Sequence, residues 1–491
     1  MPVHILASSI SSTVPTQYWA TIAASLIAIS FLKTWSKGAK LLDPPSPSPD
    51  PSLTDLHGRV ILIASGAFTP LGVVTLSALA HRGAQIIALH PDIASPQVVQ
   101  LISLIRDSTQ SELVYAEQCD LSSLESISAF AALWNSGDKK QQGGVRRLDG
   151  LLFLPPAREE LRSVQVGEGG GRRERIYQLH VLARFHLVNS LLSGLLVQPR
   201  EREVRVVSVV SPFYAAGLTH FDVLAPTTPP STKRGGKKEK ESTGQTAKSQ
   251  LQTLSESSYS ALVGAASLRW HALTVELQRR VDLLAEADPR PKTKLPGIDV
   301  LPTTTTTTPS SKPTATETIQ QQAATRMCQH SNIAIINVCV GFERSSDIID
   351  TFLPSPSTSS STLRTFLRTL LLLLLWPLIW LLSKSPATAA DSVVWATTRH
   401  LEPLSARFDR VLTALTTTTT TTREGKGGEV RRWQDPLIPG ELYREGRIVR
   451  PRLPSRFGEE GAAWSELWRQ TEHDVEVKVR QRGGEIKRPK V

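Results

Sequence analysis

A glycine-containing turn near the start of the chain has the residue types needed to hold a phosphate group. The run Arg59–Ala64 (RVILIA) is short, apolar and rich in β-branched residues, and Ser65–Gly72 (SGAFTPLG) follows it directly. Glycine lets backbone N–H groups approach a pyrophosphate, and the N-terminus of a following helix favours its negative charge. The same turn also fits a helix cap that binds nothing, and the sequence leaves both interpretations open.

The segments around this turn alternate between short apolar runs and stretches with helical spacing, which positions the turn between a strand and a helix. Near-continuous apolar strands separated by helices are typical of a parallel sheet covered on both faces. We therefore predict an α/β fold with a doubly wound parallel sheet. The expected strands are Arg59–Ala64, Gln85–Leu89, Glu112–Glu117, Leu148–Leu154, Val204–Val210 and Ile333–Val340, and the expected helices are Val73–His81, Pro96–Ile105, Leu124–Trp134, Ile176–Leu196 and Tyr259–Arg280.

An apolar run close to the N-terminus predicts a membrane anchor. Tyr18–Leu32 is almost wholly apolar, and Lys33, Lys37 and Lys40 follow it. Positive charge after the run, with bulky residues at its exit, indicates a signal anchor rather than a cleaved signal peptide. The positive-inside rule then places the main domain in the cytosol, and the endoplasmic reticulum is the expected membrane. An interfacial anchor is the alternative, because a span needs about 20 apolar residues.

Composition argues against several classes of function. The net charge of +11 is spread over tails and insertions rather than gathered on one periodic face, so we expect no nucleic-acid partner. The three cysteines, Cys119, Cys328 and Cys339, form no CxxC pair and have no regular histidine spacing nearby. We therefore expect neither a disulfide framework nor a metal site, which fits a reducing compartment.

Three polar segments interrupt the alternating pattern: residues 227–252, 302–317 and 416–428. They lack the apolar residues needed to offset ordering entropy, so we predict disordered insertions. The expected organisation is an N-terminal tail (1–17), a membrane anchor helix (18–32), a basic and Pro-rich linker (33–57), a main domain (58–400) and a C-terminal extension (401–491) with a Thr tract and a closing helix (462–473).

Four segments share their residues and their order with one protein family. They are Cys119–Ser122 (CDLS), Leu124–Ala132 (LESISAFAA), Leu148–Leu151 (LDGL) and Ser383–Trp395 (SKSPATAADSVVW). Together they resemble the short-chain dehydrogenase/reductase superfamily, most closely its retinol-dehydrogenase and WW-domain oxidoreductase branch. The resemblance covers roughly two thirds of the chain. It implies a Rossmann-type fold, an NADP(H) cofactor and an apolar small-molecule substrate, and it leaves a homodimer open.

The resemblance also implies that the glycine-containing turn is the family's TGxxxGxG cofactor loop. Ser65 stands for its threonine, and Gly66 and Gly72 match two of its glycines. Pro70 replaces the middle glycine. Because proline has no N–H and fixes φ near −65°, the loop loses a phosphate donor, and we expect weakened NADP(H) binding.

Two further positions match the family's contacts to the adenosine part of the cofactor. His90, at the end of the second strand, stands where relatives that prefer NADP carry arginine. Asp120 matches the aspartate that contacts the adenine ring. His90 fits a plain loop residue equally well, and Asp120 also suits a helix cap.

In this family a tyrosine transfers the proton, a serine orients the carbonyl, a lysine four residues after the tyrosine lowers its pKa, and an asparagine supports a water relay. Tyr259 and Ser211 match the tyrosine and the serine. Val263 occupies the lysine position, one helical turn after the tyrosine, and His180 occupies the asparagine position. An aliphatic residue cannot lower a tyrosine pKa from its usual value near 10, so we expect Tyr259 to be a weak acid–base group.

These departures favour a membrane-anchored pseudo-oxidoreductase that retains NADP(H) or lipid binding. Leu154–Ala157 (LPPA) also replaces the family's NNAG segment, and Val340–Gly341 replaces its Pro-Gly pair. Two alternatives stay open: an active NADP-dependent oxidoreductase of a sterol, retinoid-like or acyl lipid, and a membrane scaffold without cofactor. His180 could be a substitute base, since the imidazole pKa lies near 6.5, although a structural histidine is the simpler interpretation.

A second apolar run, Phe366–Leu382, lies where the family has its substrate lid. By hydropathy it is also a transmembrane candidate, but a span would put the helix that follows on the wrong side of the bilayer. We expect an apolar lid in the membrane interface, where Trp376 and Trp380 suit the boundary. In the closing helix, Trp464 and Trp468 lie four residues apart, and we expect them to serve packing.

Overall fold

The computed structural model divides the chain into two compact units. Unit 1 comprises residues 1–40 and 341–389, and unit 2 comprises residues 41–340 and 390–491. The structure describes residues 19–38, 41–42, 55–137, 146–164, 171–198, 202–222, 224–225, 259–287, 331–344, 362–401, 436–458 and 462–481. The predicted N-terminal tail and the three predicted insertions lie outside these residues, as does Cys328.

The described residues of unit 2 form an eight-stranded sheet with the order β3-β2-β1-β4-β5-β6-β7-β8. Neighbouring strands are parallel except for the last pair, β7 and β8. The chain runs from β1 outward to β3 and then returns to β4 on the other side of β1, so the predicted doubly wound α/β fold is confirmed. The strands are β1 Val60–Ser65, β2 Gln85–His90, β3 Val114–Gln118, β4 Gly150–Phe153, β5 Val204–Val210, β6 Ile333–Cys339, β7 Leu442–Arg444 and β8 Arg447–Val449.

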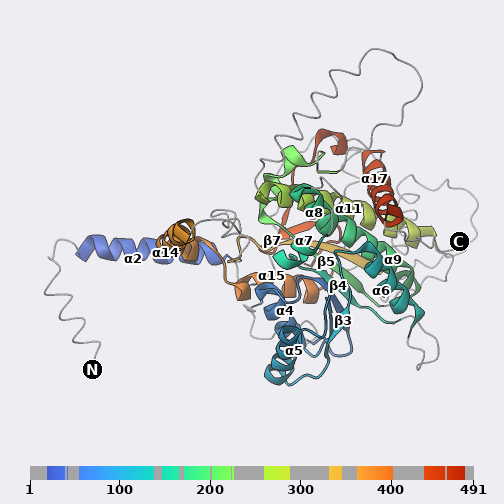
Figure 1. Cartoon of the computed structure of the whole chain (residues 1–491), viewed down its shortest axis with the longest axis horizontal. Coiled ribbons are helices and arrows are strands. Elements are labelled where there is room, and N and C mark those ends of the chain that lie inside the picture. Colours follow the sequence, from blue (N-terminus) through green and yellow to red (C-terminus); the bar gives the residue numbers. More distant parts are fainter. Residues whose placement is uncertain are drawn as a thin grey trace, which may run out of the picture. The chain divides into compact units, whose positions relative to one another are not determined.

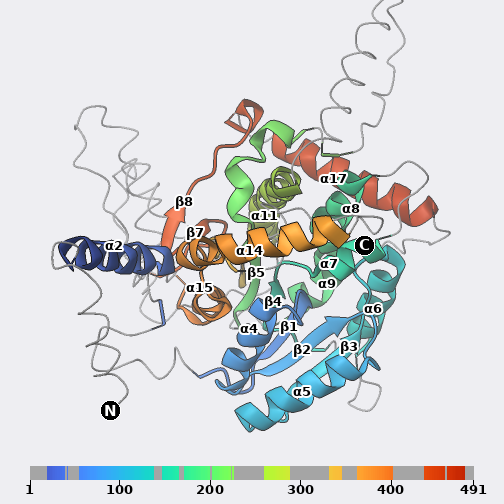
Figure 2. The ribbon, with the colours of Figure 1, turned by 60° about the vertical axis from the view of Figure 1, so that its left-hand side comes forward.

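Helices cover both faces of this sheet (Figure 1, Figure 2). α4 and α5 lie on one face, and α6, α9 and α11 lie on the other. The helices are α4 Pro70–Ala80, α5 Pro96–Thr109, α6 Leu124–Ser136, α7 Arg158–Ser163, α8 Arg172–Tyr177, α9 Ala183–Val197, α11 Tyr259–Ala287, α15 Pro386–Thr398 and α17 Ala462–Gln481, with short helical turns η2 Gln178–Leu182, η3 Pro212–Ala215, η4 Leu218–His220 and η5 Ser455–Gly458.

The core lies between the central strands and these helices. Every residue of β5 and β6 is buried, which explains why both strands are apolar apart from Arg205, Ser208 and Asn337. The long helix predicted over Ile176–Leu196 consists of α8, the π-helical turn η2 and α9 in succession. The combined helix Arg172–Val197 is long and apolar enough to cross a membrane, but 67% of its apolar 18-residue window is buried inside the protein. Such burial is typical of a core helix.

The C-terminal region belongs to the same compact unit. The β7–β8 pair, which the sequence pattern does not predict, extends the sheet beyond β6. α17 packs against α11 and α6. Its Trp468 is 8% exposed, and the ring lies 4.7 Å from that of Phe185. The Trp464 ring lies 4.9 Å from that of Phe457, so both tryptophans serve packing as expected.

Unit 1 contains α2 (Trp19–Lys37) and α14 (Thr362–Leu382), which pack against each other. The predicted anchor and lid runs are therefore both helical. Their apolar parts, Ala23–Thr34 and Thr369–Leu382, are shorter than the combined core helix of unit 2. A short parallel bridge between Glu343 and Lys384 lies in the same unit.

Candidate functional site

The carboxyl ends of β1 and β4 are where a doubly wound sheet binds its ligand. β1 is hydrogen-bonded to β2 on one side and to β4 on the other, so the direction of strand succession reverses between β1 and β4. Ligands of open α/β sheets bind outside the strand ends at such a switch point. The segments that follow these two strands, residues 65–72 and 154–157, are the ones that the sequence singled out.

The two glycines of the turn are required by its backbone packing. Gly66 has a φ of +67°, and a Cβ there would lie 2.1 Å from the carbonyl oxygen of Pro155. A Cβ on Gly72 would lie 2.0 Å from the carbonyl oxygen of Gly66. The Ser65 hydroxyl donates a hydrogen bond of 2.7 Å to the Leu154 carbonyl oxygen and so ties the end of β1 to the end of β4. These glycines therefore shape the turn whether or not it holds a phosphate.

The N-terminus of α4, the helix that follows the turn, is capped by the Thr69 side chain. The Thr69 hydroxyl accepts the N–H of Gly72 at 3.1 Å and donates to the carbonyl oxygen of Gly66 at 2.7 Å. Pro70 is the first helical residue, a position that suits proline because its N–H would have no partner within the helix. Two backbone positions that could have faced a phosphate thus offer no free N–H: residue 70 has none, and that of residue 72 is bonded.

A carboxylate lies against this turn. Glu160, on α7, accepts hydrogen bonds from the backbone N–H groups of Gly66 and Ala157. Its Oε2 atom is buried and has no hydrogen-bond partner among the described residues. Burial, with a smaller contribution from the charge of Asp120, raises the pKa of Glu160 to about 7, against the effects of its two N–H donors and of Arg184. The sequence analysis missed this residue, although a glutamate in the first turn of helix after β4 was a usable signal.

Arg184 lies in the same region, also unpredicted. Its side chain is buried, and Nη2 donates a hydrogen bond of 3.1 Å to the Leu154 carbonyl oxygen. The guanidinium carbon is 5.7 Å from the centre of the Phe153 ring. Burial lowers the pKa of Arg184 to about 10, while the charge of Glu160 opposes that change. The guanidinium therefore stays protonated near neutral pH.

His180, at the family's asparagine position, lies in the π-helical turn η2 and is 6% exposed. Its Nε2 atom has no hydrogen-bond partner among the described residues. Burial and the charge of Arg184 lower the pKa of His180 to about 3. An imidazole with so low a pKa is a weak general base at neutral pH.

The two positions matched to the adenosine part of a cofactor make local contacts. The ring of His90 meets that of Phe68 edge to face at 5.1 Å, and its Nδ1 atom lies 2.7 Å from the carbonyl oxygen of Asp92. The Asp120 carboxylate accepts both the N–H and the hydroxyl of Ser122 at 2.8 Å. Asp120 therefore stabilises the turn before α6, whereas the N-cap of α6 is Ser123, whose side chain accepts the N–H of Ser126.

The positions matched to the catalytic serine and tyrosine lie on two elements that pack together, η3 and α11. Ser211 caps η3, and its hydroxyl accepts the N–H of Phe213 at 3.3 Å. η3 packs closely on α11, where a Cβ on Gly264 would lie 2.1 Å from the carbonyl oxygen of Phe213. Tyr259 begins α11, and Val263, one turn later, is half-buried against the core. The family's lysine position is therefore part of an apolar contact.

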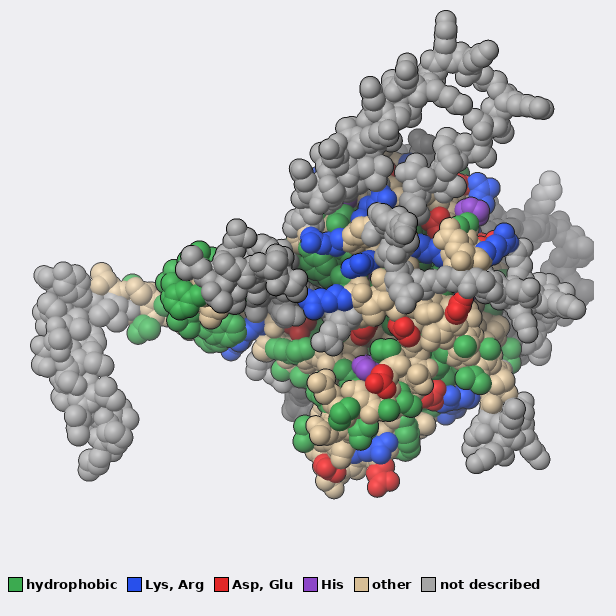
Figure 3. Space-filling view, viewed as in Figure 1, with side chains coloured by type: hydrophobic (Ala, Val, Ile, Leu, Met, Phe, Trp, Pro, Cys, Tyr) green, Lys and Arg blue, Asp and Glu red, His purple; other side chains and the backbone are tan. Residues whose placement is uncertain are grey.

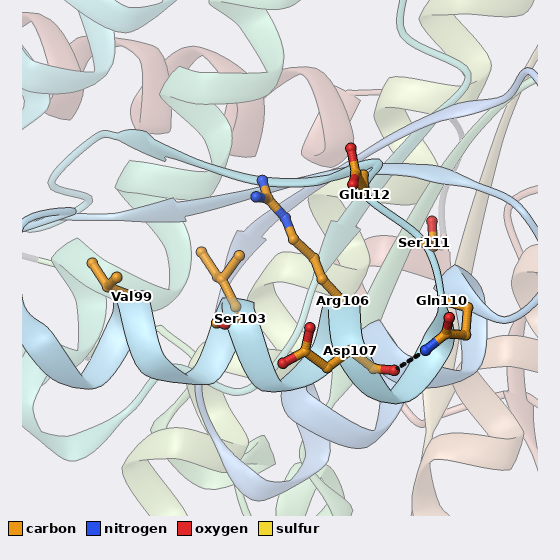
Figure 4. A pocket seen from close by; sticks show the side chains of 8 residues that line it. Val99, Ser103, Arg106, Asp107, Gln110, Ser111 and Glu112 are labelled. Atoms are coloured by element: carbon orange, nitrogen blue, oxygen red, sulfur yellow. Dashed lines mark hydrogen bonds between the residues drawn. The ribbon is translucent and has the colours of Figure 1, made fainter.

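A surface hollow lies elsewhere, along α5 (Figure 4). Two of its polar side chains form hydrogen bonds with nearby backbone groups: Arg106 donates to the carbonyl oxygen of Val114, and Gln110 donates to that of Asp107. None of the predicted site residues lines it. Within the described part of the chain, no group of three or more His, Cys, Asp or Glu residues could hold a metal ion.

The sheet and the turn after β1 define unit 2 as a doubly wound α/β domain. Comparison with known proteins indicates the class of protein that it resembles. The chain is similar to an uncharacterized oxidoreductase of Saccharomyces cerevisiae, with 27% identity over 219 residues that cover 42% of this chain and 49% of the relative. An uncharacterized oxidoreductase of Schizosaccharomyces pombe is 27% identical over 215 residues, covering 42% and 52%. The chain thus spans about half the length of these relatives, and its sequence is oxidoreductase-like.

No model of a protein family matches the chain. Among solved structures, salutaridine reductase from Papaver somniferum is 12% identical, with a TM-score of 0.37 over 70% of this chain and 96% of that one.

Proposed function

We propose that unit 2 is a short-chain dehydrogenase/reductase-like domain that binds a nicotinamide nucleotide weakly and has lost ordinary redox turnover. The observation that carries this proposal is Val263, half-buried against the core one helical turn after Tyr259. Proton transfer by a tyrosine near neutral pH needs a nearby positive charge that lowers its pKa from about 10. An aliphatic side chain cannot supply that charge.

Among the described residues, neither Arg269 nor His180 replaces the lysine. The next basic residue on α11 is Arg269, whose guanidinium donates to Gln470 at 2.9 Å and lies 5.5 Å from the Tyr177 ring. The Arg269 guanidinium is therefore held by its contacts with α17 and with the Tyr177 ring. His180 is buried with a strongly lowered pKa, so it does not carry positive charge near neutral pH.

The turn after β1 supports weak nucleotide binding. The glycine geometry fits a pyrophosphate, but an ionised Glu160 at the N–H of Gly66 does not, because like charges repel. Pro70 and the Thr69–Gly72 bond leave fewer donors. We therefore expect NADP(H) to bind when Glu160 is protonated, and we assign no hydride-transfer step.

The test is nucleotide binding and turnover by the full-length chain in detergent micelles at pH 6, where Glu160 is largely protonated. We expect wild type to bind NADPH and to show no turnover on a panel of sterol, retinoid and acyl ketones. Val263→Lys should gain turnover, and Leu284→Lys, on an exposed part of α11, should not. A wild-type kcat of the usual 1 to 10 s⁻¹ or more for any of these ketones would refute the proposal. Absence of binding at millimolar NADPH would favour a scaffold without cofactor.

An active NADP-dependent oxidoreductase of an apolar alcohol or ketone is the second candidate. The close packing of η3 on α11 favours it, because this packing brings the segment of Ser211 to the helix that begins with Tyr259. The same kinetic experiment separates the two candidates.

We also propose that the chain is attached to a membrane through residues 18–32, with the main domain in the cytosol and the endoplasmic reticulum as the membrane. The exposed apolar residues of α2 support attachment, and the lysines that follow support this orientation. A homodimer stays open, and size-exclusion chromatography with light scattering in micelles would determine it.

A further inference from the structure

α2 and α14 together expose a large apolar surface. On α2 the exposed fractions reach 70% at Ile27 and 71% at Phe31, and on α14 they reach 73% at Leu373 and 75% at Leu374. Figure 3 shows hydrophobic side chains gathered around α14 where it lies against α2. Neither helix contains an acidic residue. An exposed apolar surface of this extent is typical of an interaction site.

The two helices differ in how the apolar residues are distributed. On α2, exposed apolar residues such as Leu26, Ile27 and Ile29 point to different sides of the helix. A helix that is apolar all round belongs in a hydrocarbon environment. On α14, Leu372, Leu375 and Ile379 are half-buried at helical spacing, so one face of α14 is covered and the remainder is exposed.

A cluster of cations and tryptophans marks one end of this surface, and we call Lys33, Lys37, Arg344, Trp376 and Trp380 the basic–aromatic collar. Lys33 Nζ donates to the carbonyl oxygens of Trp380 and Ser383, and it lies 4.4 Å from the centre of the Trp380 ring. The Arg344 guanidinium lies 5.8 Å from the Trp376 ring. Tryptophan and lysine or arginine are the residues that anchor proteins at the boundary between lipid headgroups and acyl chains.

The collar residue Arg344 also joins the two ends of the chain segment that carries α14. Arg344 Nε donates to the Ser383 hydroxyl at 3.2 Å, so the chain leaves and returns at the same place. If α14 crossed the bilayer, residues 345–361 would have to cross it as well. That sequence contains two aspartates and many serines, which do not cross hydrocarbon exposed to lipid. The α2 and α14 axes also cross, since α14 is seen end on in Figure 1, where α2 is lengthwise, and is lengthwise in Figure 2.

We infer that unit 1 is a bilayer-docking element in which α2 enters the hydrocarbon and α14 lies in the interface of the same leaflet, with the basic–aromatic collar against anionic lipid headgroups. The part of α2 that precedes Lys33, residues 19–32, is about 21 Å long at about 1.5 Å per residue, which reaches past the middle of a hydrocarbon layer of about 30 Å. Lys33 links the two helices at the depth where its ammonium can still reach the headgroups. This inference rests on the membrane attachment proposed above and is independent of the redox competence of unit 2.

Depth measurement tests the arrangement directly. In a full-length chain with Cys328→Ser, Ile27→Cys or Leu374→Cys is labelled with a fluorescent maleimide, because the remaining Cys119 and Cys339 are buried. The protein is bound to phosphatidylcholine–phosphatidylserine vesicles that contain lipids brominated near the headgroup or near the chain end. We expect the label at 27 to be quenched by deep bromines and the label at 374 by shallow bromines. Deep quenching at both positions, or no quenching at either, would overturn the inference.

Flotation with the same vesicles tests the chemistry of the contact. Ile27→Asp and Leu374→Asp should each lower the bound fraction at least about tenfold, whereas Leu133→Asp, on α6 of unit 2 and equally exposed at 70%, should not. Lys37→Ala should weaken binding about fivefold only when phosphatidylserine is present. If Ile27→Asp floats like wild type, or if the surface instead pairs two copies of the chain in cross-linking without vesicles, lipid is not the partner.

Discussion

Glu160→Gln is the substitution that most directly tests whether the turn after β1 is a nucleotide site. The Glu160 carboxylate accepts the N–H of Gly66, so a pyrophosphate on the turn would lie close to it. Two unit charges about 5 Å apart, at an effective dielectric constant of 20, repel by about 3 kcal/mol. Glutamine keeps the shape of the side chain and removes the charge.

Protonation of Glu160 limits how much the charge repulsion can weaken nucleotide binding. With a pKa of about 7, roughly one tenth of Glu160 is protonated at pH 8, and adding the proton there costs about 1.4 kcal/mol. Since this is less than the repulsion, nucleotide should bind to the protonated form, and the apparent Kd should rise about tenfold between pH 6 and pH 8. The charge of Arg184 does not change over this range, because its pKa is about 10.

The assay is isothermal titration calorimetry of the full-length chain in micelles with NAD⁺, whose phosphates do not titrate between pH 6 and pH 8. Glu160→Gln at pH 8 should bind about as tightly as wild type at pH 6, and its Kd should not depend on pH. Glu125→Gln, on the exposed start of α6, is the matched control. A wild-type Kd independent of pH, or a Glu160→Gln variant that is folded and binds like wild type at pH 8, would refute the reasoning.

Three further predictions concern the stability of unit 2 in micelles. Ser65→Ala removes the 2.7 Å bond to Leu154 and should lower the free energy of unfolding in urea by about 1 kcal/mol, while Ser65→Thr should not. Tyr177→Phe and Asp474→Ala each remove the same 2.7 Å bond between α8 and α17, so their effects should be non-additive by at least about 0.5 kcal/mol; strict additivity would exclude this coupling. Burial lowers the pKa of His271 to about 4, so the stabilising contribution of the neutral imidazole is present above about pH 6.5 and is lost as the pH falls through 4. In His271→Gln the Tm should therefore fall less over this pH interval than in wild type. A pH profile of Tm that is the same in both proteins would contradict this prediction.

The sheet could be predicted from the sequence because its strands are buried on both faces. Val204–Val210 was predicted with both ends correct, since a run of β-branched residues in the core has no competing periodicity. α4 begins at Pro70 rather than at the predicted Val73, because proline at the first helical position was treated as part of the loop. The β7–β8 pair has three residues in each strand and lies at the sheet edge, where the pattern is too short to detect.

The candidate site was predictable only in part. The turn and the helix start at Tyr259 follow local patterns, so their place in the fold could be expected. Glu160 and Arg184, 24 residues apart in the sequence, interact near the end of β4, and no local spacing pattern predicts that contact. The burial of His180 likewise depends on the elements around η2 rather than on its neighbours in sequence.

Several residues that stand where the resembled family has other residues make contacts that stabilise the local structure. The Leu154 carbonyl oxygen accepts hydrogen bonds from both the Ser65 hydroxyl and Arg184, so both partners of this backbone group are side chains of the protein itself. Pro70 suits the start of α4, and Val263 adds apolar contact to the core. Pro70 and Val263 thus each exchange a group that could face a nucleotide for one that stabilises the fold, whereas the buried His180 leaves its Nε2 atom without a partner among the described residues. Restoring lysine at 263 alone therefore leaves the phosphate turn unchanged, and for this reason the gain of turnover is best sought at pH 6, where the carboxylate beside that turn has lost its charge.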